Sequence, residues 1–366
     1  MRIAVMVLNF GEPETPTMET VVPFLERIFR TNASLDSSDT TEEEIAARSR
    51  RLALARAPGL IEEYVEIGGS PLHAQAEEQC ALLGSALRSR GHDASAYLGY
   101  QFTDPSIPDA VAAAHEAGAD LLVGLPIYPL CGPSTTVAAL DELDAAVADL
   151  GWDVPLRHVS GWHRHSGYTR LRARAVRALL ERDGLDLRDE GVRLVFSAHG
   201  TPVKYLREGS RYDVYVDDHC RALADALGVE EFELGFQNHS NRPVEWTQPD
   251  IDRVIAEVDA RVVVVVPVSF MHEQSETLAE LDRELREQAE GRGLAFHRVQ
   301  IPHADPAFID LLADLVESVA GTDRDGDRQV IDLPLLQCRC RPNANTCCTN
   351  ASLDRSTDLA SIGVPR

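Results

Sequence analysis

The stretch Val262-Val-Val-Val-Val-Pro267 decides the fold class of this chain of 366 residues. An unbroken β-branched run of this length is typical of a strand that is buried on both faces, as in a parallel sheet covered by helices. Other short apolar runs alternate with longer amphipathic segments in the same way. They lie at Ile3–Asn9, Ala94–Gly99, Leu121–Pro126, Pro155–Ser160, Val192–Ser197, Phe232–Gln237 and Ala295–Gln300. The alternation of strands and helices predicts an α/β fold.

The spacing of these strands predicts two domains of the same plan. The last three strands of the second set follow their counterparts in the first set by 138, 141 and 140 residues. We therefore expect two similar Rossmann-like domains, over residues 1–160 and 161–320, each with a four-stranded parallel sheet flanked by helices. A length of 366 residues agrees with about two domains.

An insertion follows the first strand. The first strands of the two sets are 189 residues apart, which is roughly 50 more than the other pairs. The extra residues, at about 12–60, include two helical segments, Val21–Arg30 and Glu42–Ala57. Because open α/β sheets bind ligands at the carboxyl ends of their strands, we expect the insertion to form a lid or a cleft wall. An inert elaboration is the alternative.

Composition limits the kind of protein. The chain has 35 Lys and Arg against 59 Asp and Glu, a formal net charge of −24. Such a charge repels phosphate backbones, so we expect no nucleic-acid partner. No run approaches the ~20 apolar residues of a membrane span, and Met1–Phe10 lacks the features of a secretory signal. We therefore expect a cytoplasmic location, and the sequence sets no oligomeric state.

A cysteine cluster marks residues 321–366, which we expect to form a polar linker, a cysteine-bearing segment and a mobile tail. Its members lie within eleven residues: Cys338, Cys340, Cys347 and Cys348. Thiolates this close suit an iron–sulfur cluster or zinc. Cys131, at the end of the third strand, is the best candidate for a distant fourth ligand.

Two segments place titratable side chains at the ends of central strands. His199 follows the fifth strand in a turn of small residues, where catalytic and ligand residues accumulate. After the valine run the chain enters a helix that carries Glu276, Glu280 and Glu284 at intervals of four, on one face. An imidazole and carboxylates at one sheet edge can hold a divalent ion and move protons. A solvated acidic face is the alternative.

A polar loop, residues 236–249, follows the sixth strand and contains Trp246. Its prolines and polar residues end the strand and predict a loop. An indole at a cleft edge can stack on a flat aromatic ligand, and packing in a small satellite core is the alternative.

Several segments together resemble the ferrochelatase family, whose members insert ferrous iron into a porphyrin. The resemblance extends to about residue 320. It rests on motifs that occur in order along the chain: Leu8-Asn-Phe-Gly-Glu-Pro-Glu-Thr15, Tyr64-Val-Glu-Ile-Gly-Gly-Ser-Pro-Leu72, Pro126-Ile-Tyr-Pro129, Ser134-Thr-Thr136, Ser197-Ala-His-Gly-Thr-Pro202 and Pro267–Leu278. It implies a chelatase-like fold and an enzyme of haem biosynthesis.

The resemblance also implies roles for individual residues. His199 and Glu276 are expected to be catalytic and to bind the substrate iron, with Glu280 and Glu284 leading away from them. Porphyrin contacts are implied for Phe10, Gln101, Tyr128 and Trp246. Some members carry a [2Fe–2S] cluster on C-terminal cysteines and one internal cysteine. The resemblance therefore implies such a cluster on Cys131, Cys338, Cys340 and Cys347, with Cys348 as an alternate ligand and zinc as the alternative metal.

The sequence allows more than one porphyrin substrate and more than one function. Pro13-Glu14-Thr15 resembles members that use protoporphyrin IX, so this porphyrin is expected over coproporphyrin III. The other readings are a cobalt chelatase or a non-catalytic porphyrin or haem carrier. Gln274, where the family has histidine, argues against a cobalt enzyme that uses several histidines. Four arginines of the insertion can meet propionates or make a peripheral contact with an anionic membrane: Arg48, Arg50, Arg51 and Arg56.

Overall fold

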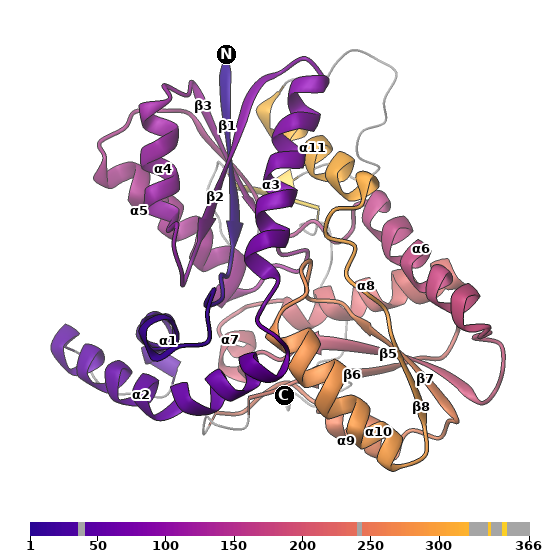
Figure 1. The fold of residues 1–366 in the computed structure, drawn as a ribbon. Helices are drawn as coiled ribbons and strands as arrows, with labels where there is room; N and C mark the ends of the chain where they lie inside the picture. Colours follow the sequence, from indigo (N-terminus) through magenta and orange to yellow (C-terminus); the bar gives the residue numbers. More distant parts are fainter. Residues whose placement is uncertain (36–40, 240–243, 322–335, 338–345, 350–366) are drawn as a thin grey trace.

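The computed structural model describes residues 1–35, 41–239, 244–321, 336–337 and 346–349. It holds two β-sheets flanked by helices (Figure 1). The first has the strand order β2 (Asp93–Tyr100), β1 (Arg2–Asn9), β3 (Leu121–Pro126), β4 (Leu156–Val159), β10 (Thr346–Cys348), β9 (Leu336–Gln337). The second has the order β6 (Glu233–Gln237), β5 (Val192–His199), β7 (Val262–Pro267), β8 (Ala295–Arg298). The predicted α/β fold with two parallel sheets is confirmed.

Helices cover both faces of each sheet. In chain order they are α1 (Met18–Thr31), η1 (Ala33–Leu35), α2 (Glu42–Glu66), α3 (Leu72–Ser89), α4 (Ile107–Glu116), η2 (Pro133–Val137), α5 (Ala138–Asp149), α6 (Ser166–Asp183), α7 (Val203–Arg207), α8 (Tyr212–Leu227), α9 (Ile251–Glu257), η3 (Glu276–Leu285), α10 (Arg286–Gly291) and α11 (Pro306–Ala320). On the first sheet, α4 and α5 form one apolar core and α3 and α11 the other. On the second, α6 and α8 face α9 and α10 across the strands.

The first sheet holds two more strands than the four expected. β10 pairs in parallel with β4, where Cys347 lies opposite Val159, and β9 pairs antiparallel with β10. These segments of two and three residues are too short to show an alternating pattern in the sequence. They cover the edge that β4 would otherwise present to solvent. Cys338 and Cys340 lie outside the described residues, as do residues 350–366, for which the expectation of a mobile tail stays a prediction.

The last described long helix returns to the first sheet. α11 belongs in sequence to the second expected domain, residues 161–320, but it lies beside α3 (Figure 1). Its buried Phe308 and Leu312 share a core with Val5 and Val123 of the first sheet. Because α11 follows β8 of the second sheet and packs in the core of the first, it connects the two sheets.

The insertion after β1 forms a helical pair, α1 and α2, that packs beside the carboxyl end of the first sheet (Figure 1). Thr41 begins α2 with a capping box, because its hydroxyl accepts from the backbone N–H of Glu44 at 3.2 Å. We predicted a helix that ends before Pro58, yet α2 continues to Glu66. Ala57, Leu60 and Tyr64 lie buried against α1 on either side of the proline, which keeps the helix continuous. None of the described helices is both long and apolar enough to cross a membrane.

Candidate active site

A cleft of about 300 Å³ lies at the carboxyl ends of β1, β3, β5 and β7. α1 supplies an apolar wall to it: Phe24, Leu25, Ile28 and Phe29. α2 adds Leu60 and Tyr64, and the loops after the strands supply the polar groups. A mostly apolar hollow with a few convergent polar groups is the usual form of a ligand site. The insertion therefore forms a cleft wall, as one of its two readings predicted.

His199 is the last residue of β5 and projects into this cleft. Its backbone N–H donates to the Ser269 hydroxyl at 2.9 Å, which fixes the turn. Its ring Nδ1 lies 2.6 Å from the carbonyl oxygen of Gly200. A carbonyl only accepts, so Nδ1 carries the hydrogen of this bond. In the neutral ring the lone pair is therefore on Nε2, which faces the cleft.

Glu276 forms an ion pair with His199 and lies on the helix that follows the neighbouring strand β7. It opens η3, a helix with i→i+5 hydrogen bonds that follows β7, and its Oε1 lies 3.0 Å from His199 Nε2. The amide of Gln274 donates to the other carboxylate oxygen. One turn on, Glu280 accepts from the side-chain amide of Gln237 at 2.8 Å, and the same amide also donates to the Glu276 carbonyl at 2.9 Å. Widened helical turns of this kind are frequent at functional sites.

The charges of His199, Glu276 and Glu280 shift one another's pKa values. Burial acts to lower the pKa of His199, but the charge of Glu276 and the hydrogen bond to it outweigh burial and raise that pKa to about 9. Burial acts to raise the pKa of Glu276, and His199 reverses the shift, so this carboxyl is held ionised. Burial and the charge of Glu276 raise the pKa of Glu280 to about 8. Near neutral pH the imidazolium and the Glu276 carboxylate share one proton while Glu280 keeps its own.

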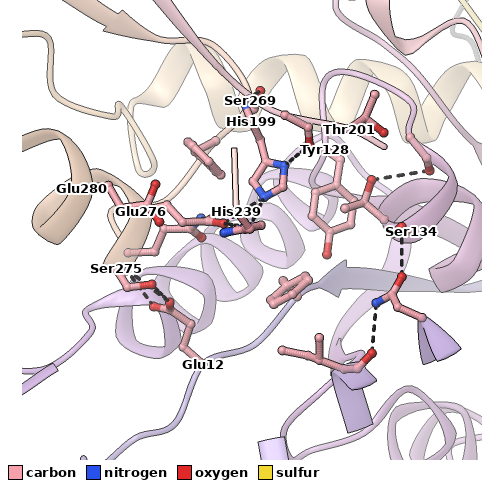
Figure 2. Close-up of a pocket in the computed structure, with 18 of the residues that line it drawn as sticks. Glu12, Tyr128, Ser134, His199, Thr201, His239, Ser269, Ser275, Glu276 and Glu280 are labelled. Atoms are coloured by element: carbon pink, nitrogen blue, oxygen red, sulfur yellow. Dashed lines mark hydrogen bonds and ion pairs between the residues drawn. The ribbon is translucent and has the colours of Figure 1, made fainter. Parts of the chain in front are cut away.

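A second imidazole, His239, completes the group. It lies two residues after β6, and its Nε2 is 3.2 Å from His199 Nε2 and 4.0 Å from Glu276 Oε1. Figure 2 shows the three side chains directed toward one another. In the loop after β6 sequence reasoning identifies Trp246 and does not identify His239. The rule that selected His199, a polar side chain just past a strand end, applied equally to His239.

A family model for ferrochelatase matches residues 2–320. A ferrochelatase of Synechococcus sp. (strain RCC307) is 35% identical over 345 residues, which cover 89% of this chain and 85% of the relative. A ferrochelatase of Citrifermentans bemidjiense is 29% identical over 325 residues, which cover 87% of this chain and 99% of the relative. The chain belongs to the ferrochelatase family. It is an enzyme that inserts a metal ion into a porphyrin, and the expectation of an enzyme of haem biosynthesis is confirmed.

One solved structure has a similar fold. SirB from Bacillus subtilis with Fe3+ aligns with a TM-score of 0.53 over 88% of this chain and 98% of SirB. The two are 13% identical, so the likeness shows the chelatase fold alone.

Three of the expected porphyrin contacts line the cleft of the ferrochelatase: Phe10, Tyr128 and Trp246. The fourth, Gln101, does not. It is buried behind Tyr128, whose hydroxyl donates to its side-chain oxygen at 2.8 Å. Gln101 is therefore placed to orient Tyr128 rather than to touch a ligand.

The three glutamates of η3 do not all lie in the cleft. Glu276 and Glu280 line the cleft, but Glu284 does not. The Glu284 side chain is 57% exposed and pairs with Arg283 at 3.1 Å. The wide turns of η3 lead the row of glutamates out to solvent, so the expected metal role does not extend to Glu284 within the cleft.

Glu12 is a cleft residue that sequence reasoning missed. It follows β1 and is 4% exposed. Its carboxylate accepts from the hydroxyl of Tyr64 on α2 at 2.9 Å, and from Ser70 and Ser275. Burial raises the pKa of Glu12, against the hydrogen bonds that lower it. The residue ties the insertion to the segment that begins η3, directly beside Glu276 (Figure 2).

Proposed function

We propose that this ferrochelatase inserts ferrous iron into protoporphyrin IX. The observation that carries the proposal is the pair formed by His199 and Glu276, 3.0 Å apart on the polar wall of a mostly apolar cleft. Nitrogen and carboxylate ligands suit a borderline divalent ion, and the apolar wall of α1 suits a flat macrocycle.

Proton exchange at this pair accounts for the reaction. A divalent ion that binds His199 Nε2 and Glu276 Oε1 displaces the proton that they share. When the ion passes into the ring, it leaves these two groups free to accept the pyrrole protons. Glu280 holds a proton of its own near neutral pH because its pKa is raised to about 8. It releases this proton toward the exposed end of η3 and takes a replacement from Glu276. The charge of the entering ion is balanced by the protons that leave.

The charge of the cleft supports protoporphyrin IX over coproporphyrin III. Coproporphyrin III carries more carboxylates, where protoporphyrin IX has apolar vinyl groups. Among the described lining residues the one arginine is Arg56, and its guanidinium is already paired with Glu63 at 2.8 Å. A cleft with an apolar wall and so few cations accommodates the less charged ring better.

A turnover comparison tests the choice of substrate. The full chain is given ferrous iron without oxygen and either porphyrin, and the loss of porphyrin fluorescence is followed. We expect a higher kcat/KM for protoporphyrin IX, and a higher value for coproporphyrin III contradicts the choice. His199→Ala should lower kcat by ~100-fold, about 2.7 kcal/mol of barrier, while porphyrin still binds. Glu287→Gln, on the exposed face of α10, is the matched control and should turn over normally.

We also propose a [2Fe–2S] cluster held by Cys131, Cys338, Cys340 and Cys347. Support comes from the neighbours of two of these thiols. Cys347 lies in β10 beside β4, and the backbone N–H of Trp162, just after β4, donates to the carbonyl of Pro129 at 3.1 Å. Pro129 is two residues from Cys131, which is 3% exposed. Thiolate ligation of this kind requires a reducing compartment such as the cytoplasm.

Colour and metal content test the cluster. Protein purified without oxygen should be reddish-brown and should lose this colour in Cys131→Ser. Colourless protein with stoichiometric zinc contradicts the cluster and supports zinc on the same thiolates. Colour that persists in Cys131→Ser and vanishes in Cys348→Ser reassigns the fourth ligand to the tail.

A peripheral membrane contact through α2 completes the proposal. Arg50, Arg51 and Leu54 are exposed on this helix, and Leu54 is 44% exposed. Arg50 pairs with Glu26 at 2.7 Å and stays 54% exposed, so it keeps access to an anionic surface. Exposed arginines beside an apolar side chain are the elements of an interfacial helix.

A further inference from the structure

We propose that His239 is a third ligand in the metal site of His199 and Glu276, and that the three side chains bind a borderline divalent ion before the porphyrin arrives. The inference rests on the proposed function for the role of the ion as a substrate. Binding of the ion itself is tested without a porphyrin.

The separations of the ligand atoms fit an ion. Nε2 of His199, Nε2 of His239 and Oε1 of Glu276 are 3.0, 3.2 and 4.0 Å apart, taken in pairs. The circle through three points with these separations has a radius of about 2.0 Å, close to the Zn–N and Zn–O bond lengths of roughly 2.0–2.2 Å. An ion at its centre is within bonding distance of all three atoms without any movement of the side chains.

The rings are held in the orientation that ligation requires. His199 uses Nδ1 for the carbonyl of Gly200 at 2.6 Å, which directs the lone pair of Nε2 at the group. The His239 ring packs edge-on against Trp246, with centroids 5.4 Å apart and planes at 79°. This contact sets the ring plane of His239 and turns its Nε2 toward the other two ligands.

His199 ends β5, His239 lies two residues after β6, and Glu276 opens the helix that follows β7. These three strands are neighbours in the order β6-β5-β7. Hydrogen bonds join their ends to one another. Gly200 N–H donates to the Gln237 carbonyl at 2.7 Å, and the Gln237 side chain donates to the Glu276 carbonyl at 2.9 Å. Asn238, next to His239, donates to the Thr247 carbonyl at 2.9 Å. A site on connected strand ends keeps its geometry better than one on a free loop.

The ligand set selects a class of ion. Two imidazoles and one carboxylate suit Fe2+, Co2+, Ni2+ and Zn2+, whereas Mg2+ and Mn2+ prefer oxygen ligands. Three ligands around one ion also leave coordination positions open, as in catalytic metal sites. Those positions face the cleft, where the nitrogens of a porphyrin can take over the ion.

A cobalt titration of the full chain tests the inference. Co2+ is added without porphyrin, and its visible d–d absorption gives both the affinity and the coordination. His239→Ala should weaken Co2+ binding at least ~10-fold, and His239→Glu, whose carboxylate reaches about as far from the backbone as the imidazole Nε2 and so restores a ligand, should recover most of the affinity. The matched control is His115→Ala, because His115 also packs edge-on against an indole, Trp152 at 4.8 Å, but lies on the exposed face of α4.

The outcomes separate this inference from the proposed function. Unchanged Co2+ affinity and spectrum in His239→Ala, with the unfolding temperature also unchanged, overturn the third ligand even if iron insertion proceeds. Co2+ binding that depends on His239 supports the site even if ferrous iron is not the ion inserted. Mn2+ that competes with Co2+ at equal concentration contradicts the expected class of ion.

Discussion

A methyl group added at Gly200 tests how closely the segments that follow β5 and β6 pack against one another at the site. The Cβ of Gly200→Ala would lie 2.8 Å from the Gln237 carbonyl oxygen and in collision with the side-chain amide of Asn238. The carbonyl cannot withdraw, because it accepts the backbone N–H of Gly200 itself at 2.7 Å. Overpacking of this kind costs about 1–3 kcal/mol, and the relief is a displacement of the loop after β6. That displacement carries His239 away from His199.

Urea unfolding and Co2+ titration of Gly200→Ala measure the two consequences. We expect the free energy of unfolding to fall by ~1–3 kcal/mol and the Co2+ affinity to fall with it. The control is Gly291→Ala at the end of α10, where an added Cβ meets no atom within 4 Å. It should leave the stability unchanged or slightly raised, because alanine restricts the unfolded chain. A Gly200→Ala protein with the stability and Co2+ affinity of the parent refutes the close fit of these loops.

Three further predictions concern single features of the site. Glu276→Gln removes the charge that raises the pKa of His199, so burial should dominate and this pKa should fall. NMR titration of the histidine ring protons measures the pKa, and an unchanged value means that the pair is not coupled. Trp246→Leu should weaken porphyrin binding by ~5–10-fold through the loss of about 1 kcal/mol of aromatic contact, measured by fluorescence quenching, and unchanged affinity removes Trp246 from the porphyrin contacts. Arg50→Glu combined with Arg51→Glu should lower binding to anionic vesicles by at least ~10-fold with kcat unchanged; vesicle binding at the parent level contradicts the membrane contact.

The strands and the principal pair of the site follow from the sequence because both depend on local patterns. The valine run predicts a strand over Val262–Pro267, and β7 has these bounds. The run is easy to delimit because a strand buried on both faces has no polar interruption. His199 and Glu276 were identifiable because His199 stands at the carboxyl end of one apolar strand and Glu276 opens the helix that follows another. Parallel strands bring their carboxyl ends to one edge, so the two side chains met as expected.

The features that the sequence did not reveal depend on contacts between distant segments. β10 is three residues long, and its pairing with β4 leaves no period to detect. Glu12 has no neighbour in the sequence that marks it, since its partners Tyr64 and Ser275 come from α2 and from the start of η3. The i→i+5 bonds of η3 are equally invisible in the spacing of its carboxylates, which fits an ordinary helix as well.

The most direct test of the central claim is a single-turnover measurement. Enzyme loaded with protoporphyrin IX is mixed with ferrous iron in the absence of oxygen, and the porphyrin fluorescence is followed in the parent and in Glu276→Gln. The account predicts complete conversion to haem by the parent, and a rate ~100-fold lower in the variant with porphyrin still bound, about 2.7 kcal/mol of barrier. Bound porphyrin that the parent does not convert, or a variant as fast as the parent, would contradict iron insertion at the pair of His199 and Glu276.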